Sequence, residues 1–194
     1  MLDAIVITIG IVGITASLLY KLLLLAYRAD KRTAAPHPVL PMPLELTLRS
    51  AQPSDAPAVA HLIGGLAHYF LADPAAAEAG PFLENFSVDA VARCIADPAI
   101  DYVVACVGTE LVGVAALRGQ THVHHLFVRA DLHGQGIARG LWQRLKAGAG
   151  DTTHFTVNSS LYAVPTYAAF GFAPTAEVQA RNGVRYQPMA LQEA

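Results

Sequence analysis

The chain has 194 residues, of which 54% are hydrophobic, and its formal net charge at pH 7 is −2. This length fits one domain with a short additional element, and the small negative charge gives no sign of a nucleic-acid-binding surface. The only two cysteines, Cys94 and Cys106, lack CxxC spacing, so we expect reduced core residues rather than a disulfide framework.

Residues 4–27 form an almost wholly apolar stretch, interrupted by Lys21. At 1.5 Å per residue, about 24 residues suffice to cross the hydrocarbon core of a bilayer. A secretory signal peptide would have a basic start and a small-residue cleavage site, whereas this stretch follows Met-Leu-Asp and shows neither. Residues 1–32 are therefore predicted to be a transmembrane anchor. A helix packed on the domain and a start codon assigned too far upstream are the alternatives.

The charges that flank this stretch predict its orientation. Arg28, Lys31 and Arg32 follow it, while Asp3 precedes it. The positive-inside rule therefore places the C-terminal side in the cytoplasm, as a single-pass membrane protein.

Residues 33–43, TAAPHPVLPMP, are predicted to be a Pro-rich tether, and residues 44–194 a folded domain. Alternating and helical hydrophobic patterns give the order β-α-α-β-β-β-α-β-α-β-β. Ser54 and Ser87 are the expected N-caps of the first two helices. The predicted strands cover residues 44–49, 102–107, 111–117, 122–128, 154–158, 178–181 and 184–189, the last two flanking an Asn-Gly turn.

A glycine-rich turn, His133-Gly134-Gln135-Gly136-Ile137-Ala138-Arg139-Gly140, lies between the strand at 122–128 and a helix. Such a turn predicts an anion site, because free N–H groups and the helix dipole point at the ligand. A Rossmann dinucleotide site would need a longer βαβ unit with a later acidic residue, and a P-loop would need GK[ST]. A plain strand–loop–helix connection is the remaining alternative for the segment taken alone.

Two motifs occur together. Residues 133–138 resemble the [Q/R]-x-x-G-x-[G/A] signature of the GCN5-related N-acetyltransferase (GNAT) superfamily, with His133 in the Gln/Arg place. Downstream, residues 158–172 resemble its second motif, in which a strand ends in Asn and a helix carries Tyr before an aromatic-Gly-aromatic turn. The resemblance covers roughly residues 46–191. It implies the α/β (α+β) GNAT fold, a mixed and mostly antiparallel sheet flanked by helices.

The resemblance also implies acetyl-CoA as co-substrate and a set of residues that bind it. The pyrophosphate is expected on the main chain of residues 134–139, and the pantetheine and acetyl group along the strand before it. The residues expected to contact the donor are Phe127, Val128, His133, Gly134, Gln135, Gly136, Ile137, Ala138, Arg139 and Asn158. Asn158 has the alternative role of capping the next helix, for which Ser159 and Ser160 compete.

Tyr167 is the predicted general acid, which protonates the departing thiolate; its alternative role is that of a core tyrosine. His122 and His124 are the candidate bases. They are expected on one face of their strand, with His125 on the other. An ordinary core or surface position is the alternative for each histidine. We expect no metal, because only an i, i+2 pair converges on a strand and no cysteine or paired carboxylate joins it.

The sequence therefore predicts a membrane-tethered, acetyl-CoA-dependent N-acetyltransferase that acts on a primary amine of a small molecule or peptide. A non-catalytic acyl-CoA-binding regulatory module and a transferase of longer acyl groups are the alternatives. A homodimer is compatible with this prediction, and nothing in the sequence names the acceptor.

Overall fold

The computed structural model describes residues 45–71, 80–181 and 184–193. The predicted anchor, the tether and the Asn182-Gly183 turn lie outside these ranges. No helix within them is both long and apolar enough to span a membrane. The elements are β1 (Leu46–Ser50), η1 (Pro53–Asp55), α2 (Ala56–Gly65), η2 (Ala67–Tyr69), α3 (Gly80–Leu83), η4 (Glu84–Phe86), α4 (Val88–Ala96), β2 (Ile100–Val107), β3 (Glu110–Arg118), β4 (His122–Val128), η5 (Ala130–Leu132), α5 (Ile137–Gly148), β5 (His154–Ser160), α6 (Val164–Ala169), β6 (Ala173–Pro174), β7 (Gln179–Arg181) and β8 (Val184–Gln192).

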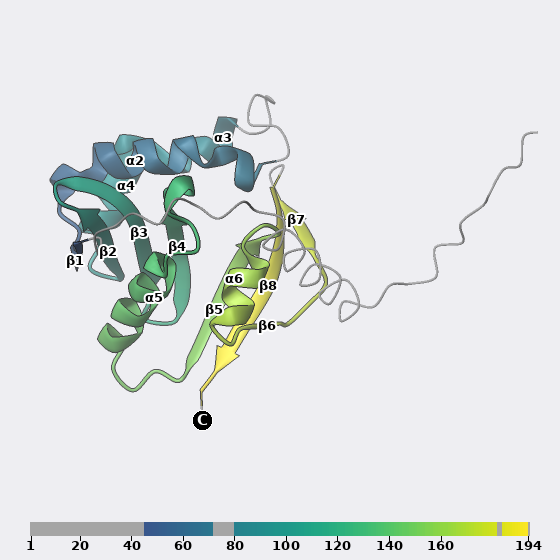
Figure 1. The fold of residues 1–194 in the computed structure, drawn as a ribbon. Helices are drawn as coiled ribbons and strands as arrows, with labels where there is room; N and C mark the ends of the chain where they lie inside the picture. Colours follow the sequence, from purple (N-terminus) through teal and green to yellow (C-terminus); the bar gives the residue numbers. More distant parts are fainter. Residues whose placement is uncertain (1–44, 72–79, 182–183, 194) are drawn as a thin grey trace, which may run out of the picture.

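One sheet organises the domain, in the order β1-β2-β3-β4-β5-β8-β6, with β7 paired to β8 (Figure 1). All its strand pairs are antiparallel except β4 with β5, which confirms the predicted mixed, mostly antiparallel sheet. Because β4 and β5 run parallel, their connection must cross over the sheet, and α5 is that crossover. The short α3 and the two-residue β6 are additions to the predicted order.

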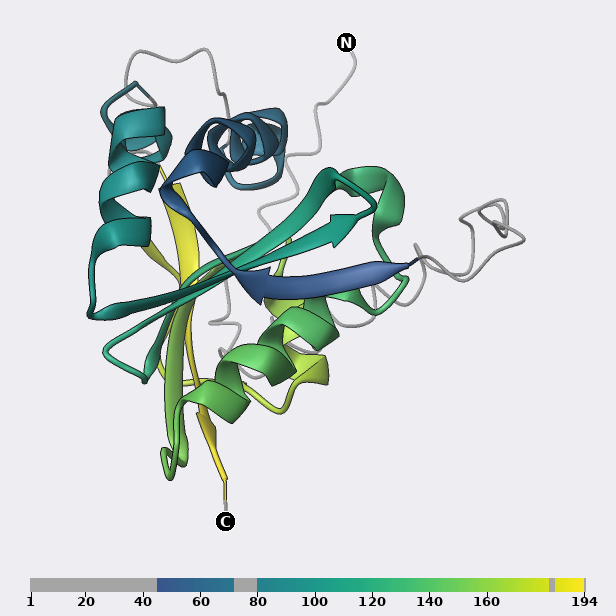
Figure 2. The same cartoon turned by 90° about the vertical axis from the view of Figure 1, so that its left-hand side faces the viewer.

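Helices cover both faces of the sheet (Figure 2). On one face, α5 and α6 bury an apolar cluster that includes Leu141, Leu145, Phe155 and Phe172. On the other, α2 and α4 bury Val59, Ile63 and Val91 against the central strands, in a separate cluster. The strands between the two layers are therefore apolar on both sides, which explains the nearly unbroken hydrophobic runs in β2 and β3.

The start of α2 differs from the prediction. Ser54 lies inside the 3-10 turn η1, and Asp55 is the residue at the helix boundary. Its carboxylate accepts the Gln52 N–H at 2.8 Å and two Arg49 N–H groups at 2.7 and 2.8 Å. Asp55 therefore closes a capping box with Gln52 at the start of η1, and no described side chain caps the first turn of α2. Ser87, in contrast, caps α4 as predicted, because its hydroxyl accepts the Ala90 N–H at 3.3 Å.

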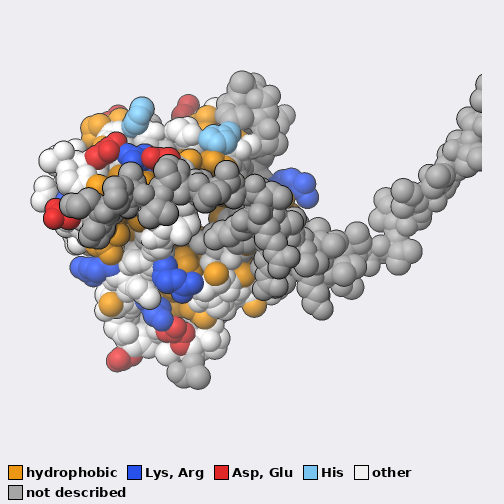
Figure 3. Space-filling view, in the orientation of Figure 1, with side chains coloured by type: hydrophobic (Ala, Val, Ile, Leu, Met, Phe, Trp, Pro, Cys, Tyr) orange, Lys and Arg blue, Asp and Glu red, His pale blue; other side chains and the backbone are white. Residues whose placement is uncertain are grey.

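The described surface carries charges of both signs. On the face shown in Figure 3, Lys and Arg side chains occur together with Asp and Glu rather than in one basic patch. This mixture agrees with the small net charge of the whole chain.

Candidate functional site

The start of α5 presents a row of free backbone donors. Gly136 is the N-cap residue, with φ 86°, and Gly134 has φ 80°, so both adopt a left-handed conformation that favours glycine. A Cβ atom at either position would meet nothing within 4 Å, so the space in front of the turn is open. Within the described part of the chain, no group accepts a hydrogen bond from the amides of residues 134–139. This cradle of N–H groups at a helix start fits a pyrophosphate.

The His133 side chain does not point at this cradle. Its Nε2–H donates to the Val128 carbonyl at 2.7 Å, which leaves Nδ1 to accept from the Tyr162 hydroxyl at 3.3 Å. The Tyr69 ring lies 4.3 Å from that of Tyr162 and 5.7 Å from that of His133. His133 therefore fastens the end of β4 to the cradle loop. No sequence motif marks Tyr69 or Tyr162, so the sequence did not predict their place beside His133.

β4 and β5 part soon after they meet. Only His122 with Thr156 and Val123 with Val157 are paired, and the strands diverge beyond them (Figure 1). The backbone N–H of Arg129 donates to the Val112 carbonyl in β3. Backbone N–H and C=O groups point alternately to the two sides of a strand. Those of Leu126 and Val128 therefore point away from β3, into the gap between β4 and β5. The Val128 carbonyl is taken by His133.

The same alternation turns the polar groups of Phe127 toward β3, where Val114 is its partner. Phe127 contributes its ring instead to the α2/α4 face, 5.7 Å from Phe70 and 6.0 Å from Phe86. The backbone of Leu126, which the sequence did not single out, thus lines the gap in place of that of Phe127.

A bulge at His124 corrects the predicted placement of the histidines. Ala116 pairs with His125 and Leu117 with Val123, so His124 has no partner in β3. One extra residue reverses the alternation of side chains, and His125 therefore lies on the same face as His124 instead of the opposite one. Their rings stack at 4.3 Å, with an interplanar angle of 20°.

Each of the three histidines has its own polar partner. His122 Nδ1 and the Thr156 hydroxyl share a 2.8 Å hydrogen bond. The Arg118 guanidinium donates to His124 Nε2 at 3.2 Å, and Cys94 Sγ lies 3.9 Å from the same nitrogen. The buried His125 Nδ1 lies 2.8 Å from the Tyr102 hydroxyl.

These surroundings keep the three imidazoles neutral. Burial, and then the charge of Arg118, lower the pKa of His122 below its ordinary value. Burial, helped by Arg118 and His122, lowers the pKa of His124 to about 4. Burial, helped by His124 and Arg118, lowers the pKa of His125 to about 3. Because Arg118 already donates to His124 Nε2, His122 has the more available nitrogen of the two predicted bases.

Tyr167 lies in the apolar cluster under α5 and α6. Its ring meets those of Phe170 and Phe172 at centroid distances of 6.2 and 5.4 Å. The Tyr167 hydroxyl has no hydrogen-bond partner among the described residues. Every fully buried polar side-chain atom of the described residues does have a partner, so this hydroxyl keeps some contact with solvent. Burial raises the pKa of Tyr167 above its ordinary value, so the phenol stays protonated. The histidines, in contrast, lie on the α2/α4 side of the sheet, so Tyr167 and the histidines lie on opposite faces of it.

The end of β5 also differs from the prediction. The strand continues to Ser160, two residues beyond Asn158. The Ser160 hydroxyl accepts the Ala163 N–H at 3.3 Å, so Ser160 caps the turn into α6. Asn158 is exposed and lines a cavity beside the histidines.

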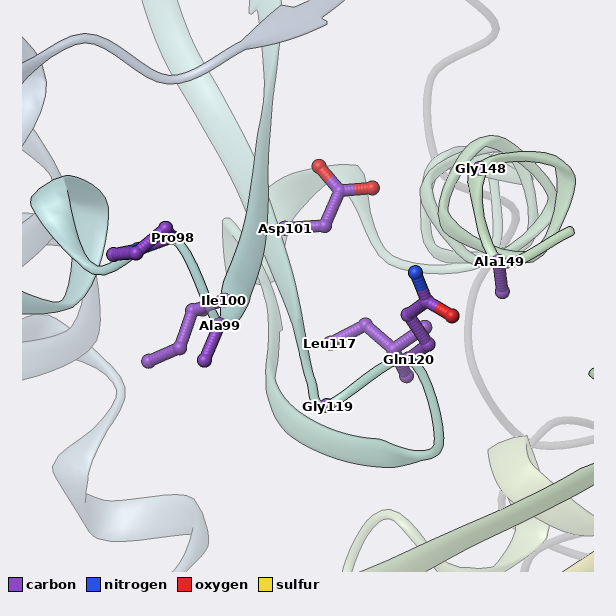
Figure 4. Close-up of a pocket in the computed structure, with 9 residues that line it drawn as sticks. All are labelled: Pro98, Ala99, Ile100, Asp101, Leu117, Gly119, Gln120, Gly148 and Ala149. Atoms are coloured by element: carbon purple, nitrogen blue, oxygen red, sulfur yellow. The ribbon is translucent and has the colours of Figure 1, made fainter.

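This histidine-lined cavity, of about 590 Å³, opens where β4 and β5 separate, on the α2/α4 side. Its walls combine apolar, basic and imidazole side chains, and they include Phe82, Phe86, Arg93, Cys94, Asp97, Arg118, His122, His124, His125 and Asn158. A cavity of about 530 Å³ lies at the other end of α5, lined by Asp101, Gln120 and Gly148 among others (Figure 4). Because it lies at the end of α5 opposite to the cradle, we place the site at the first cavity and the gap. Within the described ranges, no group of three His, Cys, Asp or Glu side chains could hold a metal ion.

Comparison with known proteins agrees with this geometry. The family model of an acetyltransferase (GNAT) domain matches residues 70–193. Curated protein sequences give no match.

Solved structures share the fold at low sequence identity. A GCN5-related N-acetyltransferase from Rhodopseudomonas palustris is 22% identical, covers 78% of this chain and 99% of its own, and has a TM-score of 0.66. The PaiA N-acetyltransferase of Thermoplasma acidophilum, solved with coenzyme A, is 12% identical over 77% of this chain and 99% of its own, with a TM-score of 0.62. The ribosomal-protein-S18-alanine N-acetyltransferase of Escherichia coli is 17% identical over 76% and 93%, with a TM-score of 0.53.

Proposed function

Since the chain belongs to the GNAT acetyltransferase family, we propose that it transfers the acetyl group of acetyl-CoA to a primary amine of a small molecule or peptide. One observation carries this proposal. The free amides of residues 134–139 follow the end of β4, β4 pairs with β5 at only two positions, and a cavity lined by neutral histidines lies beside those positions. Donor site, reaction channel and acceptor site are then continuous.

The donor is held chiefly by main-chain groups. The amides of residues 134–139 bind the pyrophosphate, and the N–H of Leu126 faces the gap, where it donates to an oxygen of the extended donor. Residues 123–128 of β4 span about 17 Å at 3.3–3.4 Å per residue, a length that the pantetheine arm matches. The thioester is thereby placed near the histidine-lined cavity.

His122 is the base in this proposal. It stands where β4 and β5 begin to separate, and the Thr156 hydroxyl fixes its ring through Nδ1. Its lowered pKa leaves it neutral at pH 7, so it accepts a proton from the ammonium form of the acceptor directly or through water. Thr156 acts on the reaction only by orienting that ring.

Tyr167 is the acid. The amine nitrogen forms a bond to the carbonyl carbon, the carbon–sulfur bond breaks, and the Tyr167 hydroxyl gives its proton to the departing thiolate. Burial raises its pKa, so the phenol keeps its proton until that late stage. Because a thiolate is ordinarily a weaker base than a phenolate, the transfer depends on the close placement of the hydroxyl and the departing sulfur.

The test is acetyl transfer by the purified protein. Acetyl-CoA should bind in calorimetry, and a panel of primary amines should include acceptors that release free thiol and gain one acetyl group by mass. Donor binding without transfer to any amine would instead support a binding module and would overturn the proposed activity.

We further propose that residues 4–27 anchor the domain to a membrane, with the domain on the cytoplasmic side. The apolar stretch and the basic residues after it support this proposal. Acetyl-CoA is a cytoplasmic metabolite, which agrees with this orientation.

A further inference from the structure

The histidine-lined cavity contains two arginines that lack an acidic partner. Arg49, Arg129 and Lys146 each pair with a carboxylate. Arg93 and Arg118 form no ion pair with any described residue. Two unpaired guanidinium groups in one cavity favour an anionic ligand, because each presents N–H donors in a fork that matches a carboxylate.

The remaining charges of the cavity do not cancel this preference. Asp97 is its only acidic lining residue among those described, and its Oδ1 accepts the Ala99 N–H at 2.9 Å at the end of α4. The three histidines are neutral at pH 7, because burial and Arg118 lower the pKa of each. With two arginines against one aspartate, the lining is cationic at neutral pH.

Another part of the cavity lining is apolar. Phe82 and Phe86 are half-buried, and their rings meet edge to face at 5.3 Å. Phe86 also lies 5.5 Å from His125 and 6.0 Å from Phe127. An apolar group of the ligand can therefore pack against aromatic surface while its anionic group faces the arginines.

From this arrangement we infer that the acceptor is a primary amine that carries a carboxylate and an apolar side chain, of the size of an apolar amino acid. This inference rests on the proposed function and specifies its substrate class. The arginines bind the carboxylate, the Phe82–Phe86 wall takes the side chain, and the amine faces His122 at the mouth of the gap. A polyamine is excluded, because its charges would be repelled by both arginines.

The test compares acceptors that differ only in the anionic group. Phenylalanine should be acetylated with a kcat/KM at least about ten-fold above that of phenylalaninamide. Arg93→Gln and Arg118→Gln should each reduce this ratio toward one, mainly because kcat/KM for phenylalanine falls. Arg144→Gln, an exposed arginine of α5 outside the cavity, should leave the ratio unchanged. Equal rates for acid and amide, preferred acetylation of spermidine, or the same loss in the Arg144 variant would overturn the inference.

Binding gives a second readout that does not depend on turnover. N-acetylphenylalanine should bind the protein–coenzyme A complex at least about ten-fold more tightly than N-acetylphenylalaninamide. Equal affinities, or binding of neither, would contradict a carboxylate site. Failure of the proposed function would look different, since acetyl-CoA would not bind or no amine would be acetylated. Failure of this inference alone would leave amines acetylated without regard to a carboxylate.

Discussion

At the level of single residues, Tyr167 combines a buried ring with a hydroxyl that no described residue engages. Tyr167→Phe keeps the ring and its contacts with Phe170 and Phe172, so folding and acetyl-CoA affinity should change little. The turnover number should fall about 10²-fold, because the proton for the thiolate is lost. Steady-state kinetics measure the turnover number, and a thermal melt checks that the variant folds. Normal turnover in the variant would make Tyr167 a core residue only.

His122 and His124 should differ in their effect on activity. His122→Asn should lower the turnover number about 10²-fold, whereas His124→Asn, which removes a ring already bonded to Arg118, should cost much less. Since the pKa of His122 is lowered, the base stays neutral as the pH falls below 6.5, and the acid limb of kcat/KM should lie below that pH. A pH–rate profile of both variants checks the assignment. A larger loss in the His124 variant would reverse it.

His125 should make stability depend on pH. Its pKa is about 3 in the folded chain and near 6.5 when unfolded, so the unfolded state binds more protons between these values. The stabilising contribution is complete above pH 6.5 and is lost as the pH falls toward 3, by roughly 3 kcal/mol at pH 4. Urea unfolding at pH 7 and pH 4 measures it. His125→Gln, which retains a partner for Tyr102, should show a smaller difference between the two pH values; an unchanged difference would assign it to other groups.

At the level of elements, the proposed donor site depends on the left-handed N-cap of α5. Gly136→Asp adds a strained backbone and a negative charge to the cradle, so acetyl-CoA affinity should fall at least about 100-fold. Gly119→Asp is the matched control, because Gly119 also has φ +57° and open space around its Cβ but lies in the β3–β4 turn. Calorimetry on both folded variants is the measurement. Comparable affinity in the two variants would rule out the cradle.

The bulge in β4 is the second element on which the site depends. A regular strand would send His125 to the α5 side, away from His124. With one extra residue, His122, His124 and His125 all line the same cavity, and Arg118 in the neighbouring strand influences the pKa of each. The imidazole-rich lining of this cavity therefore originates in the backbone of β4, whereas its positive charge comes from Arg93 of α4 and Arg118 of β3.

At the level of the whole molecule, the proposed anchor would confine an acetyltransferase domain to a membrane surface. Full-length protein should sediment with membranes and resist carbonate extraction, and a chain that begins at Pro43 should be soluble and retain acetyl-CoA binding. Cell fractionation of the two chains decides this. Full-length protein found wholly in the soluble fraction would contradict the anchor and leave the domain assignment unaffected.

The sequence alone determined the family, the mixed sheet and the position of the glycine-rich turn before α5. These features depend on local signals, such as the glycines at 134 and 136 and the period-2 and helical patterns, which act through neighbouring residues of the chain. The Ser87 cap and the hairpin strands β7 and β8 were predictable for the same reason.

Only the tertiary structure decided the arrangement of the site. The bulge at His124 depends on how β4 aligns with β3. The turn before α2 is held by Asp55, whose carboxylate pairs with Arg49 of β1. The unpaired arginines, the Tyr69–Tyr162 contact and the parting of β4 from β5 likewise join residues far apart in sequence. A pattern along the chain fixes which way a side chain points only while the strand stays regular. The faces, partners and charges of this site are set by contacts between strands, which local sequence does not encode.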